Sequence, residues 1–90
     1  MNIGDIVISV NGRDINKRFL IIATEENYAL IANGKTRRLE KPKRKKNKHL
    51  KLESKADSAI VEKINERKMT NNEIRRYLAT MKGETPDAEG

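Results

Sequence analysis

The segment Arg18–Thr24 constrains the fold most, because it is a short aromatic and β-branched run that is apolar on both faces. Side chains of a strand alternate between the two faces of a sheet, which places Phe19 and Ile21 on one face and Leu20 and Ile22 on the other. A sheet with one face in solvent would alternate apolar and polar residues. We therefore expect a small barrel in which one face lines the core and another part of the chain covers the second face.

Two further strands are predicted, over Ile6–Val10 and Tyr28–Ala32. Asn33-Gly34 follows the latter and predicts a tight hairpin into a strand over Lys35–Leu39, because both residues tolerate positive φ.

The connection after Ile6–Val10 is predicted to be a longer loop over Asn11–Lys17, with Gly12 and Asn16 as its left-handed positions. Near the end of the sheet, His49–Leu52 predicts a short last strand with its two leucines inward.

The C-terminal third supplies the expected cover. Ser54–Asp57 and Thr70–Glu73 both match the pattern of a helix capping box. Apolar residues then recur at helical spacing, at Ala56, Ile60 and Ile64 in the first segment and at Ile74, Tyr77, Leu78 and Met81 in the second. Helices this short are marginal alone, so we expect them to pack on the face of Leu20 and Ile22.

Positive charge is concentrated in one stretch. Ten of the seventeen residues of Lys35–Lys51 are basic and one, Glu40, is acidic, so this stretch has a charge of +9. The formal net charge of the whole chain is +7, and the residues outside the stretch therefore sum to −2. Apart from Pro42, which interrupts regular pairing, no side chain between Glu40 and Lys48 is apolar. We expect a mobile loop over 41–48, and a solvated surface is the simplest alternative to a binding site.

We expect no catalytic activity, no bound metal ion and no cofactor. His49 is the only histidine and there is no cysteine, which excludes a Cys–His pair and a histidine cluster. Asp5 and Asp14 lie near turns without a visible partner base. No signal peptide or membrane-spanning run is visible, so a soluble, cytoplasmic protein is expected.

The basic stretch favours a polyphosphate partner. The backbone of Arg37, Arg38 and Lys41 would be held at the end of a strand, while Lys43–Lys48, on a loop, could follow an irregular phosphate path. This combination is suited to folded RNA recognised by shape. A DNA major groove is a less suitable partner because no basic recognition helix is evident. A membrane surface is also less suitable, because no apolar residues alternate with the lysines.

The order of residues also resembles a known family. Gly4–Asp14 is similar to the opening of a KOW domain, and Tyr28–Gly34 followed by Arg37–Leu50 resembles bacterial KOW-domain RNA-binding proteins, themselves similar to the ribosomal large-subunit family called "fourteen-e". The resemblance covers about residues 3 to 53 and implies a five-stranded SH3-like barrel that binds ribosomal RNA. Asn16 stands where many KOW motifs have a second glycine.

Together these arguments predict a mainly β fold with a helical appendage: an SH3-like KOW barrel over 1–53, a helical segment over 54–82 and a disordered tail over 83–90. The expected partner is RNA, most of all ribosomal RNA, with ribosomal proteins as further partners and a monomer when free. Which RNA is bound, and whether in the ribosome, in its assembly or in regulation, stays open.

The alternative is a protein-interaction module of the transcription or translation machinery, with Arg75 and Arg76 on its surface. The predicted RNA-binding residues are Arg13, Lys17, Lys35, Arg37, Arg38, Lys41, Lys43, Arg44, Lys45, Lys46, Lys48 and His49.

Overall fold

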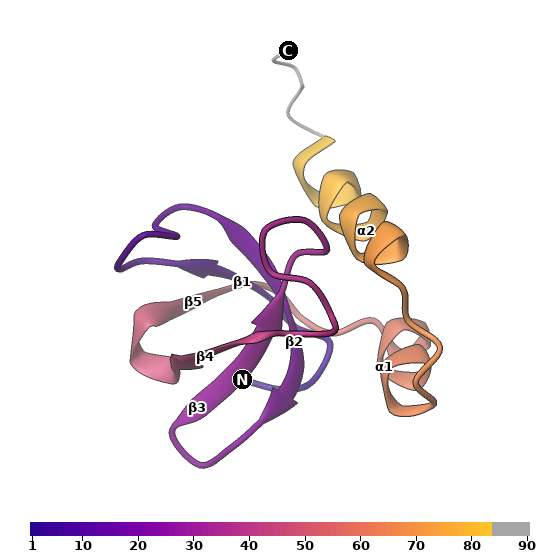
Figure 1. The fold of residues 1–90 in the computed structure, drawn as a ribbon, viewed down its shortest axis with the longest axis horizontal. Helices are drawn as coiled ribbons and strands as arrows, with labels where there is room; N and C mark the ends of the chain where they lie inside the picture. Colours follow the sequence, from indigo (N-terminus) through magenta and orange to yellow (C-terminus); the bar gives the residue numbers. More distant parts are fainter. Residues whose placement is uncertain (84–90) are drawn as a thin grey trace.

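The computed structural model describes residues 1–83, so of the tail predicted over 83–90 only Gly83 is described, as the end of a helix, and residues 84–90 lie outside the described residues. Five strands precede two helices (Figure 1). The elements are β1 (Ile6–Ser9), β2 (Arg18–Thr24), β3 (Tyr28–Ala32), β4 (Lys43–Lys46), the 3-10 helix η1 (Asn47–His49), β5 (Leu50–Ser54), α1 (Ser58–Asn65) and α2 (Asn71–Gly83). The three strands predicted within the first 32 residues are confirmed.

The strands form one antiparallel sheet in the order β4-β3-β2-β1-β5. Its central register pairs Ile6 with Leu20 and Ile21 with Ile31. The first loop, residues 10–17, connects β1 to β2. Its predicted left-handed positions are confirmed, with φ of 80° at Gly12 and 70° at Asn16.

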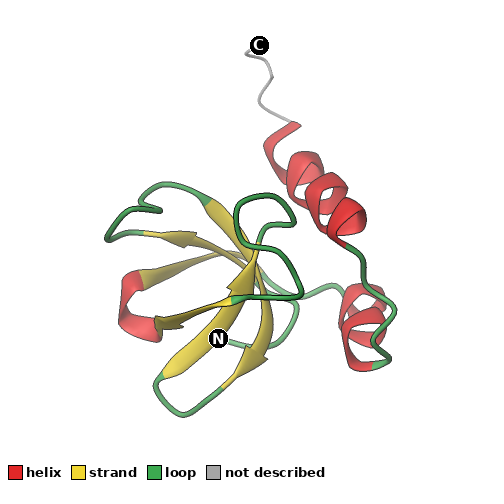
Figure 2. Cartoon of the chain, in the orientation of Figure 1, coloured by secondary structure: helices red, strands yellow, loops and turns green. Residues whose placement is uncertain are grey.

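The two edge strands are neighbours in sequence, because only the three residues of η1 separate β4 from β5 (Figure 2). A flat sheet would hold its first and fifth strands about 19 Å apart, at about 4.8 Å per strand. The four backbone steps from Lys46 to Leu50 reach at most about 14 Å even when fully extended. The sheet must therefore curl until its edges approach each other.

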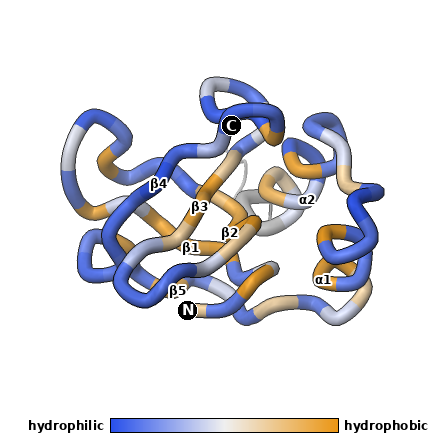
Figure 3. Tube along the Cα trace, turned by 60° about the horizontal axis from the view of Figure 1, so that its bottom comes forward, coloured by the Kyte–Doolittle hydropathy of each residue, from blue (hydrophilic) through white to orange (hydrophobic). Residues whose placement is uncertain are grey.

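Curling gives the sheet two apolar faces with different cover. The inner core consists of Val7, Phe19, Ile21, Ala29, Ile31 and Leu50. The outer core consists of Ile6, Leu20 and Ala32 from the sheet with Met69, Ile74 and Leu78 from the helical segment. The prediction that the helices cover the face of Leu20 and Ile22 is confirmed, and Figure 3 shows apolar residues on β1–β3 and on both helices. Leu50 is buried as expected, but Leu52 is 42% exposed and the prediction of an inward position was wrong.

The two predicted capping boxes have different outcomes. At α2 the box is confirmed: Glu73 N donates to Thr70 Oγ1 at 3.1 Å, and Thr70 N donates to Glu73 Oε1 at 3.1 Å. At α1 the box was wrong, because Ser54 ends β5 and Asp57 caps the helix by accepting a hydrogen bond from Ala59 N at 2.9 Å.

The hairpin predicted at Asn33-Gly34 was also wrong. Residues 33–42 form a ten-residue connection, here called the β3–β4 loop, and no strand covers Lys35–Leu39. Asn33 closes a local turn instead, since its Oδ1 accepts from Lys35 N and Arg37 N, both at 2.9 Å. Gly34 packs against α2, where a Cβ would lie 2.3 Å from Asn71 O.

The mobile loop predicted over 41–48 was wrong as well. Lys43–Lys46 forms β4, which pairs with β3 along its whole length, and η1 follows directly. The strand forms because pairing uses backbone groups, which lysine and arginine supply as well as apolar residues do. Pro42 lies just before the strand, where it removes no ladder hydrogen bond.

Candidate nucleic-acid interface

The first loop places one carboxylate among several cations. Lys17 N donates to Asp14 O at 3.0 Å and Asn16 N donates to Ser9 O at 2.7 Å, so the loop is tied both to itself and to β1. This geometry turns Asp14 inward, where it is only 4% exposed.

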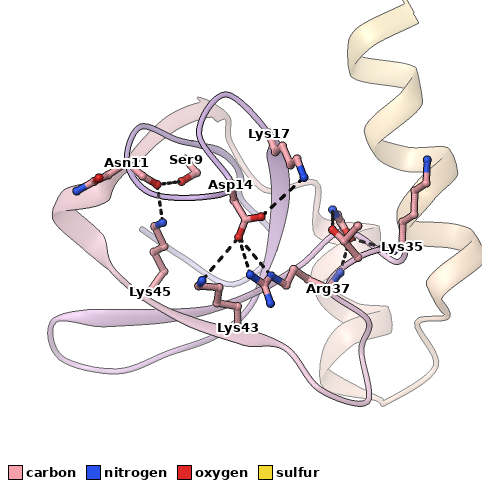
Figure 4. Close-up of polar contacts among 10 residues, drawn as sticks. Ser9, Asn11, Asp14, Lys17, Lys35, Arg37, Lys43 and Lys45 are labelled. Atoms are coloured by element: carbon pink, nitrogen blue, oxygen red, sulfur yellow. Dashed lines mark hydrogen bonds and ion pairs between the residues drawn. The ribbon is translucent and has the colours of Figure 1, made fainter.

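Three cations surround Asp14 (Figure 4). Its Oδ2 accepts from Arg37 Nη2 at 3.0 Å and from Arg37 Nε at 3.2 Å, while Lys43 Nζ lies 3.8 Å from Oδ2 and Lys17 Nζ 3.9 Å from Oδ1. We call these four residues the Asp14 cluster. One negative charge against three positive charges leaves the cluster with an excess of two.

The carboxylate of Asp14 stays ionised in this setting. Burial raises its pKa, but the hydrogen bond from Arg37 and the charges of Arg37, Lys43 and Lys17 outweigh burial, and the pKa of Asp14 is lowered overall. Asp14 therefore orients cations from three different segments without neutralising them.

Lys45 is also turned inward, and its ammonium is used within the protein. The residue is 8% exposed, and its Nζ donates to Asn11 O at 2.7 Å. The same carbonyl accepts from Ser9 Oγ at 2.9 Å. Lys45 thus fastens β4 to the first loop, in a place where an RNA phosphate would have to displace an internal hydrogen bond.

Two predicted arginines are exposed but paired with acids. Arg38 Nε lies 3.4 Å from Glu40 Oε2, and Arg44 Nε lies 2.8 Å from Glu25 Oε1. Arg44 also lies over the Tyr28 ring, with its guanidinium carbon 3.6 Å from the centroid. Exposed pairs of this kind are screened by water and contribute little to stability, so a phosphate can compete for such arginines. Contrary to prediction, no strand holds Arg37, Arg38 or Lys41, because all three lie on the β3–β4 loop.

The other predicted residues lie at the surface. None of the exposed lysines and arginines in this group has an acidic partner within residues 1–83. They are Arg13, Lys35, Lys41, Lys46 and Lys48. His49 is half-buried in η1, and its carbonyl accepts from Val10 N at 2.9 Å.

The structure distributes this contiguous basic stretch over two hollows. One, of about 450 Å³, brings Arg37, Arg38, Lys41 and Lys43 together beside the Asp14 cluster. The other, of about 480 Å³, lies around Asn27, Tyr28 and Asn47 and carries Lys46 and Lys48. β4 connects the two hollows, so the cations form a band along one edge strand rather than a single point.

Asp14 and Arg75 were missing from the predicted site. Asp14 lies 23 positions before Arg37, and no local pattern indicates that pair. The alternative function placed Arg75 on a protein-binding surface, and its use inside the molecule was not foreseen: its guanidinium donates to Gly34 O and holds the β3–β4 loop. The Asn-Gly pair was the available signal for a special backbone at that point, where Gly34 has a φ of 76°, although it was interpreted as a hairpin.

Within residues 1–83, no group of three or more histidine, cysteine or acidic side chains is arranged to hold a metal ion. No helix of the same residues combines the length and apolar character that crossing a membrane requires. Comparison of the chain with protein-family models and with curated proteins gives no match.

Proposed function

We propose that this chain is an RNA-binding protein built on an SH3-like barrel of the KOW type. The strand order, the curled antiparallel sheet and the short 3-10 connection between its edge strands support the barrel. The resemblance over residues 3 to 53 supports the KOW assignment, and it favours ribosomal RNA in the cytoplasm as the partner.

The observation that carries the function is the Asp14 cluster with its exposed basic neighbours. A buried carboxylate holds Arg37 and Lys43 at fixed positions, while Lys41 and Lys35 stay free of acidic partners within residues 1–83. Guanidinium groups held in place suit bidentate phosphate contacts, and flexible ammonium groups suit a variable backbone path. Both kinds of donor occur here together, on the β3–β4 loop and at the start of β4.

The arrangement favours folded RNA over a DNA groove. The cations of the interface lie on two loops, an edge strand and η1, and none of the predicted ones lies on a helix that could enter a major groove. RNA helices are recognised mainly by shape and through phosphate and 2′-hydroxyl contacts, which a broad, irregular band of cations can provide.

The test is the salt dependence of binding to a structured RNA. If the five exposed cations without acidic partners reach phosphates, the slope of log K against log salt should be about −4, at roughly 0.7–0.9 per contact. A triple variant with Arg13→Gln, Lys35→Gln and Lys41→Gln should make that slope about 2–3 less steep.

A matched control loses the same charge elsewhere. Lys51→Gln, Lys55→Gln and Lys68→Gln change three exposed lysines on β5, before α1 and between the helices. The control should keep most of the affinity and most of the slope. Equal losses in both triple variants would mean that only net charge matters, and salt-independent binding would exclude the band of cations as the interface.

A further inference from the structure

A second basic hollow adjoins the Asp14 cluster, because Lys17 belongs to that cluster and also lines this hollow. A cleft of about 490 Å³ opens where the first loop, the β3–β4 loop and α2 meet. This volume falls within the range of small-molecule sites, roughly 300–1,000 Å³, and exceeds what a phosphate group alone would fill. The cleft exists only because α2 is docked beside the sheet.

The cleft is cationic on several sides. Its lining includes Lys17, Arg18, Lys35 and Arg75, and no carboxylate from the described part of the chain lines it. Arg18 is committed to Glu53, with contacts of 3.0 and 3.1 Å. Figure 4 shows Lys17 and Lys35 on the α2 side of Asp14. Lys35 and Arg75 are thus left without an acidic partner among the described residues, and Lys17 shares Asp14 with two other cations, so all three can attract an anion into the cleft.

Arg75 differs from the two lysines because its guanidinium is fixed. Nη1 donates to Gly34 O, and Nη2 lies 3.4 Å from Asn72 Oδ1. Both acceptors are uncharged, so the positive charge of Arg75 is positioned but not compensated. Lys35 and Lys17 are exposed and can move toward a phosphate from the opposite loops.

The α2 side of the cleft carries apolar side chains beside Arg75. Leu78, which is 6% exposed, and the exposed Ala79 form this wall, and Asn16 adds a side-chain amide from the first loop. An apolar surface, an amide and three cations are what an unstacked nucleotide requires: a surface for the face of its base, a polar group for its edge and donors for its phosphate.

We propose that this cleft binds one unstacked nucleotide of the RNA, with its phosphate on Lys17, Lys35 and Arg75 and its base against Leu78 and Ala79. The inference rests on the proposed RNA-binding function and deepens it. The band along β4 would hold folded RNA by its backbone, whereas the cleft would capture a base that leaves the stack. The helical segment would then take part in recognition as well as covering the sheet.

The experiment blocks the cleft without changing charge. Ala79→Trp fills it from an exposed helical position, and Ala59→Trp, at an exposed position of α1, is the matched control. Backbone amide shifts of the isotope-labelled full chain are followed during titration with adenosine 5′-monophosphate, with inorganic phosphate and with a single-stranded RNA hexanucleotide. Binding of a structured RNA that contains an unpaired bulge is measured in parallel.

The amides of Asn16, Lys35 and Ala79 should shift with the nucleotide and the hexanucleotide, and more weakly with phosphate. Ala79→Trp should lower affinity for the hexanucleotide by about tenfold or more, the equivalent of one charge-assisted hydrogen bond, while Ala59→Trp leaves it unchanged. Unchanged hexanucleotide binding by Ala79→Trp would overturn the cleft proposal. So would equal affinity for phosphate and nucleotide.

The two proposals fail in different ways. If the parent chain binds the structured RNA with a steep salt slope but Ala79→Trp binds both RNAs as well as the parent, the function stands and the cleft is not a nucleotide site. If the parent chain binds neither RNA at low salt, the proposed function itself falls.

Discussion

Replacing Asp14 with asparagine removes the charge that organises the Asp14 cluster while keeping the shape of the side chain. The native carboxylate accepts two hydrogen bonds from Arg37, at 3.0 and 3.2 Å, and is 4% exposed. Hydrogen bonds to charged groups contribute roughly 1.5–3 kcal/mol to stability. The side chains of Arg37 and Lys43 are each 31% exposed and can regain water, which places the net loss near the lower end, at about 2 kcal/mol.

Urea unfolding at pH 6 measures this loss. With a slope of about 1 kcal/mol per molar, the midpoint of Asp14→Asn should fall by about 1–2 M relative to the parent. Glu26→Gln is the control, because it removes one exposed negative charge that has no ion pair within residues 1–83. Its midpoint should stay close to that of the parent.

The difference between parent and Asp14→Asn should depend on pH. Since the folded-state pKa of Asp14 lies below the unfolded value near 3.8, its stabilising contribution is fully present above pH 4 and is lost as the pH falls through the folded pKa. The gap between the two midpoints should therefore close below pH 4. A gap that stays constant from pH 6 to pH 2.5, or the absence of a gap at pH 6, would refute the assignment of Asp14 as the organising charge.

Three further substitutions test the packing around the interface. Leu78→Ala should destabilise the fold by about 2–5 kcal/mol in urea unfolding, because it empties a site between α2 and the sheet, and an unchanged midpoint would contradict that docking. Gly34→Ala would place a Cβ against the backbone of α2, at a position where φ is 76°. The backbone amide shifts of α2 should therefore change throughout the helix, and changes confined to the β3–β4 loop would count against this contact. Lys45→Gln should lower the free energy of unfolding by about 1–3 kcal/mol, because the internal hydrogen bond of Lys45 is lost. At the neighbouring exposed position, Lys46→Gln should change the free energy of unfolding by no more than about 0.5 kcal/mol. Equal effects of the two substitutions would refute the buried role of Lys45.

Local patterns were sufficient to predict much of the sheet. The apolar runs of β1, β2 and β3 indicate strands by residue type alone, and the two apolar faces of β2 required the cover that α2 provides. Gly12 and Asn16 adopt the left-handed backbone that their residue types favour. The capping box before α2 worked because all of its contacts lie within four residues.

The failures concern contacts between distant segments. Asn33-Gly34 has the composition of a hairpin turn, but the docking of α2 against Gly34 determines its geometry. β4 contains no apolar residue, and the backbone of β3 provides the pairing partner that makes it a strand. Asp14 acquires its role only when the first loop meets Arg37, which the sequence pattern of neither segment encodes.

The position of β4 at the edge of the sheet has a consequence for how copies of this protein behave toward each other. An edge strand offers unpaired backbone groups on its outer side, and another strand could extend the sheet there. In β4 all four residues are basic, so a second copy approaching edge to edge would bring its own cations against them. Repulsion between identical strands therefore protects this edge from self-association at low salt. High salt, or a polyanion that neutralises the edge without covering it, should weaken that protection.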